Sequence, residues 1–143
     1  MLTNACSRQF PNRSAETPPQ APNGRLQPIA SVAQLHEAII TPASDTLFNF
    51  GTNGAPDEAA WTAVRNGAIV LAESGNLLMM AGRARDAGEW MDFSQKLAQG
   101  GAAAIKAAEA RDMNALSTAS DRIVQVCMAC HQPYRDGGRQ MGK

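Results

Sequence analysis

Residues 124–135 read VQVCMACHQPYR, and the interpretation of the whole chain depends on this stretch. Cys127, Cys130 and His131 lie within five positions, although the 143 residues include only three cysteines and two histidines. A CxxCH cluster of this kind is typical of three sites: half of a structural zinc site, a redox-active dithiol, or the attachment point of a covalently bound haem. The rest of the sequence distinguishes among them.

The segment before this motif predicts the helix that carries it. We expect a helix from about Asp112, whose side chain suits an N-cap, to about Arg135. Apolar residues at helical spacing form its inward face, namely Leu116, Ala119, Ile123, Val126, Cys130 and Tyr134. The motif therefore lies at the C-terminal end of a helix.

This position argues against two of the three sites. A redox dithiol usually opens a helix, because the helix N-terminus lowers the pKa of a thiol, and a helix end acts in the opposite direction. A structural zinc site needs four ligands, and no second Cys or His pair stands elsewhere in the chain. Two thiols about one helical turn apart, with a histidine directly after them, suit the two vinyl groups and the iron of one haem. The sequence therefore favours haem attachment at Cys127 and Cys130.

Three more helices are predicted upstream of the motif helix from the spacing of apolar side chains. They span about 29–50, 56–83 and 86–110. The first has an inward stripe of Ile29, Val32, His36, Ile39, Ala43 and Leu47. Pro42 interrupts that helix, so we expect a kink or two shorter helices there. Gly100 and Gly101 weaken the third by about 1 kcal/mol each relative to alanine, which indicates that a haem edge or a neighbouring helix packs closely there.

The fold expected from these segments is all-α. Aromatic residues are 5% of the chain and β-branched residues are scattered singly, so no strand is predicted. Short connections place successive helices antiparallel, which gives an up-down-up-down four-helix bundle. No stretch approaches the roughly 18 to 20 uninterrupted apolar residues of a membrane-spanning helix. Lys and Arg total 13, as do Asp and Glu, so no bulk charge favours nucleic acid as a partner.

The N-terminal residues are expected to lie outside this bundle. Residues 1–28 contain five prolines and almost no large apolar side chains, so we expect a disordered tail or tether there and one folded domain over 29–143. The stretch LTNAC at 2–6 resembles the end of a bacterial lipoprotein signal, which makes Cys6 either a lipid anchor or an incidental thiol. No charged-then-apolar leader precedes Cys6, so we expect no signal peptide in the given chain.

The motif helix and the bundle together resemble a known family. The stretch CMACHQPYR at 127–135 is similar to the signature of the class II cytochromes c, of the cytochrome c′ type, in which CxxCH is followed by an aromatic residue and an arginine. The resemblance covers 29–143 and is strongest in VAQLHEAIITPASDTLF at 32–48 and in AEARDMNALSTASDRIVQVCMACHQPYR at 108–135. It implies one covalent haem c, a periplasmic location and, because the family often forms dimers, a homodimer.

The resemblance also assigns roles to residues of the motif helix. Cys127 and Cys130 would form the two thioethers, and His131 would be the proximal ligand of the iron. Arg135 occupies the family's arginine position, where it would contact a haem propionate or pack near the proximal histidine. We expect Tyr134 and Ile123, on the same helix, to line the haem pocket.

The sixth iron position faces the first helix in this superfamily. Low-spin members present a methionine there, and gas-binding members present an apolar residue. By spacing, the residue at this place is His36, so we expect two histidine ligands and six-coordinate, low-spin iron. Two alternatives stay open: an empty sixth position with His36 at the rim beside Glu37, or ligation by Met79 or Met80.

The function expected from this site is electron transport, without enzyme activity. A haem with both axial positions filled suits a periplasmic electron carrier that binds redox partner proteins. Arg135, Arg139 and Lys143 give the C-terminal end a positive bias, which favours an acidic partner. The alternative is a five-coordinate, cytochrome c′-like binder of nitric oxide or carbon monoxide. A peroxidase-like enzyme is disfavoured because no distal histidine and arginine pair is apparent.

Overall fold

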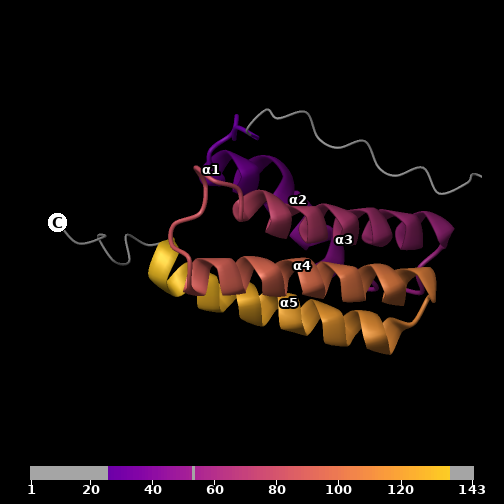
Figure 1. Cartoon of the computed structure of the whole chain (residues 1–143). Coiled ribbons are helices and arrows are strands. Elements are labelled where there is room, and N and C mark those ends of the chain that lie inside the picture. Colours follow the sequence, from indigo (N-terminus) through magenta and orange to yellow (C-terminus); the bar gives the residue numbers. More distant parts are fainter. Residues whose placement is uncertain (1–25, 53, 136–143) are drawn as a thin grey trace, which may run out of the picture.

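A computed structural model describes residues 26–52 and 54–135. The predicted tail over 1–28 lies almost entirely outside these residues, and so do Cys6, Arg139 and Lys143. The described part is all-helical, with no strand (Figure 1). A first helical segment comprises α1 (Val32–Leu35), η1 (His36–Ile40) and α2 (Thr41–Phe48), and three long helices follow: α3 (Glu58–Leu78), α4 (Glu89–Glu109) and α5 (Met113–Tyr134).

Side-chain caps explain where the helices begin. Asp57 accepts a hydrogen bond from the Ala60 N–H at 2.8 Å and begins α3, and Asp112 begins α5 as predicted. The first segment begins later than predicted, because Ser31 and Gln34 form a capping box at Val32. Ile29 therefore lies outside the helix and is 94% exposed, so its predicted place on the inward stripe is wrong.

The end of α3 also differs from the prediction. The helix ends at Leu78 and not near Arg83. Gly82 adopts the left-handed backbone conformation with φ +89°, which only glycine adopts without strain, and the chain turns back there. The Arg83 guanidinium Nε then donates to the Ala30 carbonyl oxygen at 2.9 Å. This contact holds the residues before α1 against the end of α3.

The interruption predicted at Pro42 takes the form of a π-helical turn, η1. Proline has no N–H, and its ring would crowd the carbonyl group four residues earlier, which belongs to Ala38. The helix widens just before this point, so that the Thr41 N–H donates to the His36 carbonyl oxygen, five residues back. As a result Leu35 and Ile40, also five residues apart, are both buried.

The helices α3 and α4 approach each other through small residues. A Cβ atom on Gly101 would lie 2.6 Å from the Ala72 nitrogen, and one on Gly75 would lie 2.5 Å from the Ser94 carbonyl oxygen. A Cβ on Gly100 would lie 2.8 Å from Cγ1 of Ile123 in α5. The predicted close packing at Gly100 and Gly101 is therefore confirmed, and neighbouring helices account for it.

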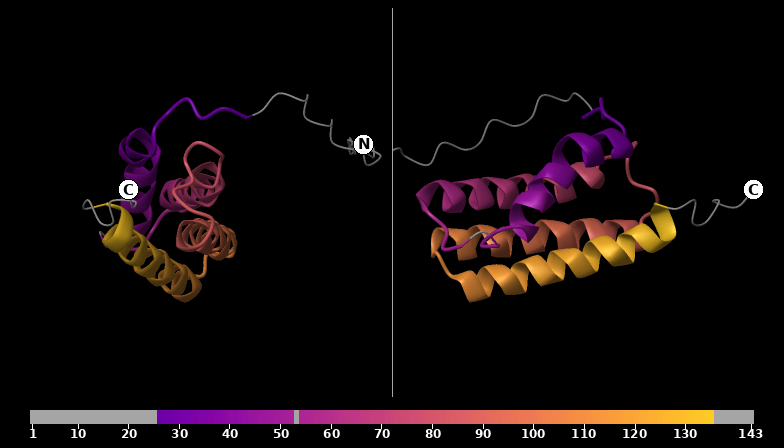
Figure 2. Two further views of the ribbon diagram at one scale, coloured as in Figure 1. Left: turned by 60° about the vertical axis from the view of Figure 1, so that its left-hand side comes forward. Right: turned by 180° about the vertical axis from the view of Figure 1, so that it is seen from behind.

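The arrangement of the helices brings the first segment beside α5. In the end-on view of Figure 2, the first segment, α3, α4 and α5 follow one another around the bundle. The α3–α4 connection lies at the end of the bundle where α5 ends, and the α4–α5 connection lies at the opposite end (Figure 1). The motif therefore lies beside the α3–α4 connection. Among the described residues, no helix is both long and apolar enough to cross a bilayer.

Candidate functional site

Most of the predicted site residues gather around one pocket, which we call the histidine pocket. It has a volume of about 460 Å³ and lies between the first segment and the end of α5. Its walls come from three places: α1 and η1, the region where α3 ends and α4 begins, and the last turns of α5. The α5 wall is made of Cys130, His131, Tyr134 and Arg135.

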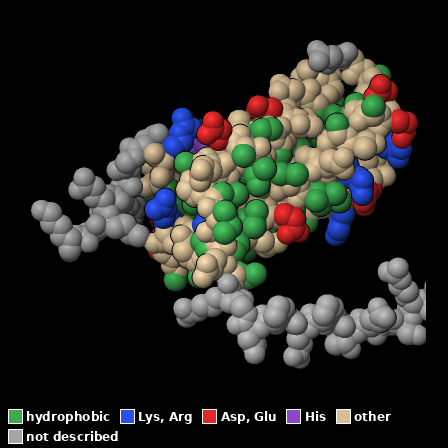
Figure 3. Space-filling view, turned by 90° about the horizontal axis from the view of Figure 1, so that it is seen from above, with side chains coloured by type: hydrophobic (Ala, Val, Ile, Leu, Met, Phe, Trp, Pro, Cys, Tyr) green, Lys and Arg blue, Asp and Glu red, His purple; other side chains and the backbone are tan. Residues whose placement is uncertain are grey.

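Two histidines face each other in this pocket. The ring centroids of His36 and His131 are 5.3 Å apart, and the ring planes are tilted by 54°. His36 is the first residue of η1, and the widened turn there leaves Leu35 in the core while His36 borders the pocket. In the space-filling view of Figure 3, only a small part of a histidine side chain is visible, beside acidic and basic side chains.

The surroundings of His36 favour the neutral imidazole. Burial lowers its pKa below the ordinary 6.5, and the nearby His131 and Arg135 lower it further through their positive charge. Neutral imidazole is the form that binds metal ions. If a metal ion bound one nitrogen of each ring at about 2 Å, the two centroids would lie about 6 Å apart. The observed separation is within about 1 Å of this value, so the two rings are near enough to contact one bound group.

The two thiols lie on the same helix, but only Cys130 lines the histidine pocket. Cys127 and Cys130 lie about one turn apart on α5, and both are half-buried. Burial raises the pKa of both thiols, and for Cys130 the neighbouring Cys127 adds to the effect and brings the pKa to about 11. A reactive dithiol needs a lowered thiol pKa, so these values disfavour that alternative.

The described residues do not provide the ligands of a structural zinc site. No group of three or more His, Cys, Asp and Glu side chains within 26–52 and 54–135 is arranged to bind a metal ion. A haem iron differs from a structural zinc ion in this respect, because the porphyrin supplies four ligands and the protein needs to supply at most two.

Two arginines stand at the edge of the pocket. Arg135, a predicted site residue, is exposed and places its NH1 atom 3.4 Å from Nδ1 of His131. Arg85 was not predicted; its guanidinium carbon lies 6.0 Å from the centroid of the Trp90 ring. Both residues line the pocket, so two positively charged side chains lie at its edge. Nothing in the sequence around Arg85 indicates this position, because it depends on the turn that follows α3.

Tyr134 lines the pocket as predicted, and it brings in a further residue that the sequence did not indicate. Its hydroxyl donates a hydrogen bond to Oδ2 of Asp86 in the α3–α4 connection. Burial first, and then this hydrogen bond and the Asp86 charge, raise the pKa of Tyr134 to about 12. The hydroxyl is therefore a hydrogen-bond donor at neutral pH.

Other predicted residues are not brought to the pocket. Ile123 is 0% exposed and lies in the core against Gly100, and it is not among the pocket-lining residues. Met79 and Met80 lie just beyond α3 and do not line the pocket either; the Met80 sulfur accepts a hydrogen bond from Arg83. Glu37 does line it, beside His36. The structure therefore offers His36, and neither methionine, opposite His131.

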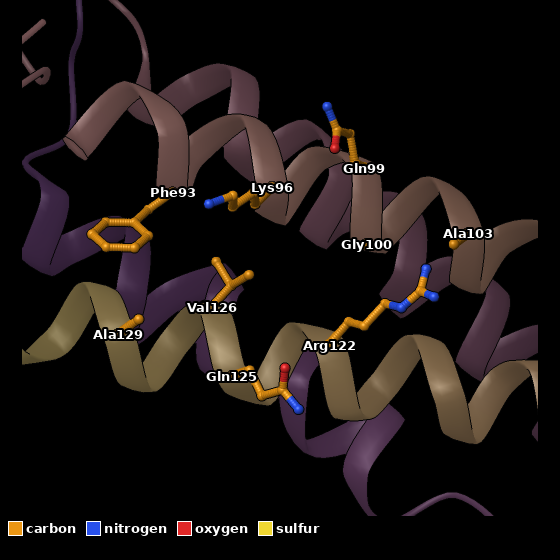
Figure 4. A pocket seen from close by; sticks show the side chains of 9 residues that line it. All are labelled: Phe93, Lys96, Gln99, Gly100, Ala103, Arg122, Gln125, Val126 and Ala129. Carbon is orange, nitrogen blue, oxygen red and sulfur yellow. The ribbon is translucent and has the colours of Figure 1, made fainter. Parts of the chain in front are cut away.

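A second hollow, the α4–α5 groove, contains none of the predicted site residues. Its volume is about 410 Å³. Phe93 and Arg122 reach between the two helices from opposite sides (Figure 4). The lysine in the groove, Lys96, forms an ion pair with Asp92 at 2.6 Å. No histidine, cysteine or carboxylate is part of its lining, so we assign the chemistry to the histidine pocket.

Comparisons with known proteins add no further assignment. No family model, no curated protein and no solved structure matches this chain.

Proposed function

We propose that the chain is a c-type cytochrome, similar to the class II cytochromes c, that carries electrons in the periplasm. One covalently bound haem c would be held within an antiparallel up-down-up-down four-helix bundle. The main support is that His36 and His131 face each other, with ring centroids 5.3 Å apart, in a pocket that Cys130 also lines. One chain segment thus supplies the thiols and one imidazole, and a distant segment supplies the second imidazole.

The residues of the pocket have separate roles in this proposal. Cys127 and Cys130 would each add a thiol across one vinyl group, so that a carbon–sulfur bond forms and the proton moves to the neighbouring carbon without electron transfer. His131 and His36 would hold the iron from opposite sides. Bound haem would supply an iron that accepts and releases one electron.

The remaining walls would exclude water and place charge. Leu78 and Trp90 are buried apolar residues that line the pocket, and Val32 is partly buried beside them. Arg85 and Arg135 are exposed at its edge, so they would bind the propionates or an acidic redox partner. Because two histidines would fill both axial positions, the iron would need little change of geometry between oxidation states.

The alternative function is binding of nitric oxide or carbon monoxide at five-coordinate iron. The apolar side chains that line the pocket support this alternative, because an apolar distal face suits a diatomic gas. The two functions differ in what His36 does. In the electron carrier His36 is an iron ligand, and in the gas binder it is not.

The proposal is tested by maturing the chain in a host with a c-type haem attachment system. A pyridine haemochrome spectrum typical of two thioethers and a low-spin ferric spectrum are the expected results. The variant His36→Ala is expected to become high-spin and to bind carbon monoxide. Met79→Leu and Met80→Leu are the matched controls, because they remove the two alternative ligands and are expected to leave the spectrum unchanged.

Three results would count against the proposal in different ways. A colourless product would exclude covalent haem. A high-spin parent that binds carbon monoxide, with the same spectrum in His36→Ala, would favour the gas binder. Loss of the low-spin spectrum in Met79→Leu or Met80→Leu would identify a methionine ligand in place of His36.

A further inference from the structure

The carboxylate of Asp86 joins several elements that border the histidine pocket. Its Oδ1 accepts backbone hydrogen bonds from Gly88 at 2.8 Å and from Trp90 at 3.2 Å, at the start of α4. Its Oδ2 accepts the hydrogen bond from the Tyr134 hydroxyl at the end of α5. One side chain therefore connects the α3–α4 turn, the first turn of α4 and the last turn of α5.

Trp90 holds Tyr134 from a second direction. The two rings meet edge to face, with centroids 5.0 Å apart and an interplanar angle of 89°. Trp90 is itself fixed, because it is 3% exposed and its Nε1 donates to the Leu78 carbonyl oxygen at 2.9 Å. The Tyr134 ring is thus held by an aromatic contact, and its hydroxyl by a carboxylate.

The last turn of α5 has fewer backbone hydrogen bonds than an ordinary helical turn. Pro133 lies inside α5 and has no N–H, so it cannot donate to the carbonyl oxygen of Ala129. The Arg135 N–H does donate to the His131 carbonyl oxygen at 3.0 Å. His131 and Tyr134 therefore belong to one turn that depends on side-chain contacts for its position.

We infer that Asp86 and Tyr134 are positioning residues, which hold the last turn of α5 so that His131 faces His36. This inference rests on the proposed function, because the consequence it describes is the strength of axial ligation by His131. Loss of the hydrogen bond between Asp86 and Tyr134 loosens the turn and weakens the hold of His131 on the iron. The thioethers at Cys127 and Cys130 keep the haem attached in either case.

The test compares three variants of the haem-loaded protein. Tyr134→Phe removes the hydroxyl but keeps the ring contact with Trp90, and Asp86→Ala removes the acceptor. Asp112→Ala is the matched control, because Asp112 caps the other end of the same helix through hydrogen bonds of 3.0 Å to the N–H groups of Asn114 and Ala115. The measurements are the ferric spectrum, the rate of carbon monoxide binding and the urea midpoint of unfolding.

The expected result separates positioning from general stability. Tyr134→Phe is expected to raise the rate of carbon monoxide binding by between about twofold and tenfold, the effect of losing one hydrogen bond, and to lower the low-spin fraction of a low-spin parent. Asp86→Ala also removes the bonds from Gly88 and Trp90, so its effect is expected to be at least as large. Asp112→Ala is expected to lower the urea midpoint without changing either property. The double variant with both Asp86→Ala and Tyr134→Phe is expected to match Asp86→Ala, because both changes remove the same bond.

Two results would overturn the inference. Unchanged spectra and binding rates in both Tyr134→Phe and Asp86→Ala would show that the hydrogen bond serves stability alone. An equal change in Asp112→Ala would show that any loss of α5 stability has the same effect. If the parent chain binds no covalent haem, the proposed function is wrong and the inference fails with it. If the parent chain binds haem and the variants keep its spectrum and binding rate, only the inference fails.

Discussion

The two long sides of the bundle are packed in different ways. The α3–α4 pair meets through Gly75 and Gly101, where an added Cβ would lie 2.5 to 2.6 Å from backbone atoms of the facing helix. The opposite side, between the first segment and α5, contains the histidine pocket of about 460 Å³ and a smaller hollow of about 290 Å³ between α2 and α5. We call this side the α5 seam. The α3–α4 side is closely packed through small residues, and the α5 seam contains a pocket beside His36, Cys130 and His131.

The difference shows how the fold separates stability from function. The α3–α4 pair contributes most of the fully buried side chains, such as Val64, Leu71 and Ala104, all 0% exposed. The α5 seam contributes half-buried residues whose polar atoms face the pocket, such as His36 and Cys130. The α3–α4 pair therefore provides a frame, and the seam provides the pocket where the proposed haem would bind.

The largest expected difference in stability is between a variant in the α3–α4 frame and a variant in α5. Leu71→Ala is expected to lower the free energy of unfolding by about 2–5 kcal/mol, because the side chain is fully buried in the frame. Met128→Ala removes a side chain of similar size that is 62% exposed on α5, the helix that borders the seam, and it is expected to change stability by about 0.5 kcal/mol or less. Urea unfolding of both variants measures the difference. Equal losses would contradict the division into frame and seam.

The next largest effect concerns the glycine contacts of the frame. Gly101→Ala is expected to cost about 1–3 kcal/mol, because the new Cβ would meet the Ala72 backbone at 2.6 Å and the helices would have to separate. At an open helical site the same change stabilises by about 1 kcal/mol. Gly100→Ala is the companion variant at the α4–α5 contact, where the new Cβ would lie 2.8 Å from Cγ1 of the fully buried Ile123, so a loss is expected there too. A stabilising Gly101→Ala, measured by urea unfolding, would show that the helices tolerate a wider spacing.

The frame could be predicted from the sequence more fully than the seam. Regular apolar spacing and the Asp112 cap predicted three long helices, and each of these overlaps its expected range. The inward face of α5 contains the expected buried residues Leu116, Ala119 and Ile123. These features depend on local preferences and on spacing along a single helix, which a sequence shows directly.

The seam depends on contacts between distant segments, so less of it could be predicted. The motif indicated His131 and both cysteines, and spacing indicated His36. The π-helical turn was not predicted, because Pro42 indicated an interruption but not its form. Asp86 was missed because its role depends on the turn that follows α3. That helix ends five residues earlier than expected, at Leu78 and not near Arg83. The exposure of Ile29 likewise depends on the Ser31 cap.

A smaller effect is expected when the seam is titrated in the chain without cofactor. The pKa of His36 is lowered in the folded state, so the unfolded state binds the proton more readily. The stability due to neutral His36 is therefore fully present above pH 6.5, the ordinary value, and it is lost as the pH falls from 6.5 toward the folded pKa. Urea unfolding at pH 7.5 and at pH 5 would measure the loss.

His36→Gln is the matched variant for this titration. Glutamine is polar and does not titrate, so the difference in stability between the two pH values is expected to be smaller in the variant than in the parent. The change isolates His36 because the charged groups that face it, His131 and Arg135, are present in both proteins. An identical pH dependence in both proteins would contradict the lowered pKa.

The smallest expected effect tests whether surface charge helps to hold the frame together. Arg65 of α3 and Glu109 of α4 form an ion pair at 3.4 Å, but their side chains are 44% and 55% exposed. Solvent screens such a pair, so a double-mutant cycle of Arg65→Ala and Glu109→Ala is expected to give a coupling energy of about 0.2–0.5 kcal/mol. The coupling should shrink further in 1 M salt, where the Debye length is about 3 Å. A coupling well above 1 kcal/mol would mean that charge, and not the approach at Gly75 and Gly101, determines how firmly α3 and α4 are joined. The geometry favours the glycines, because their contacts are excluded from water and the ion pair is not.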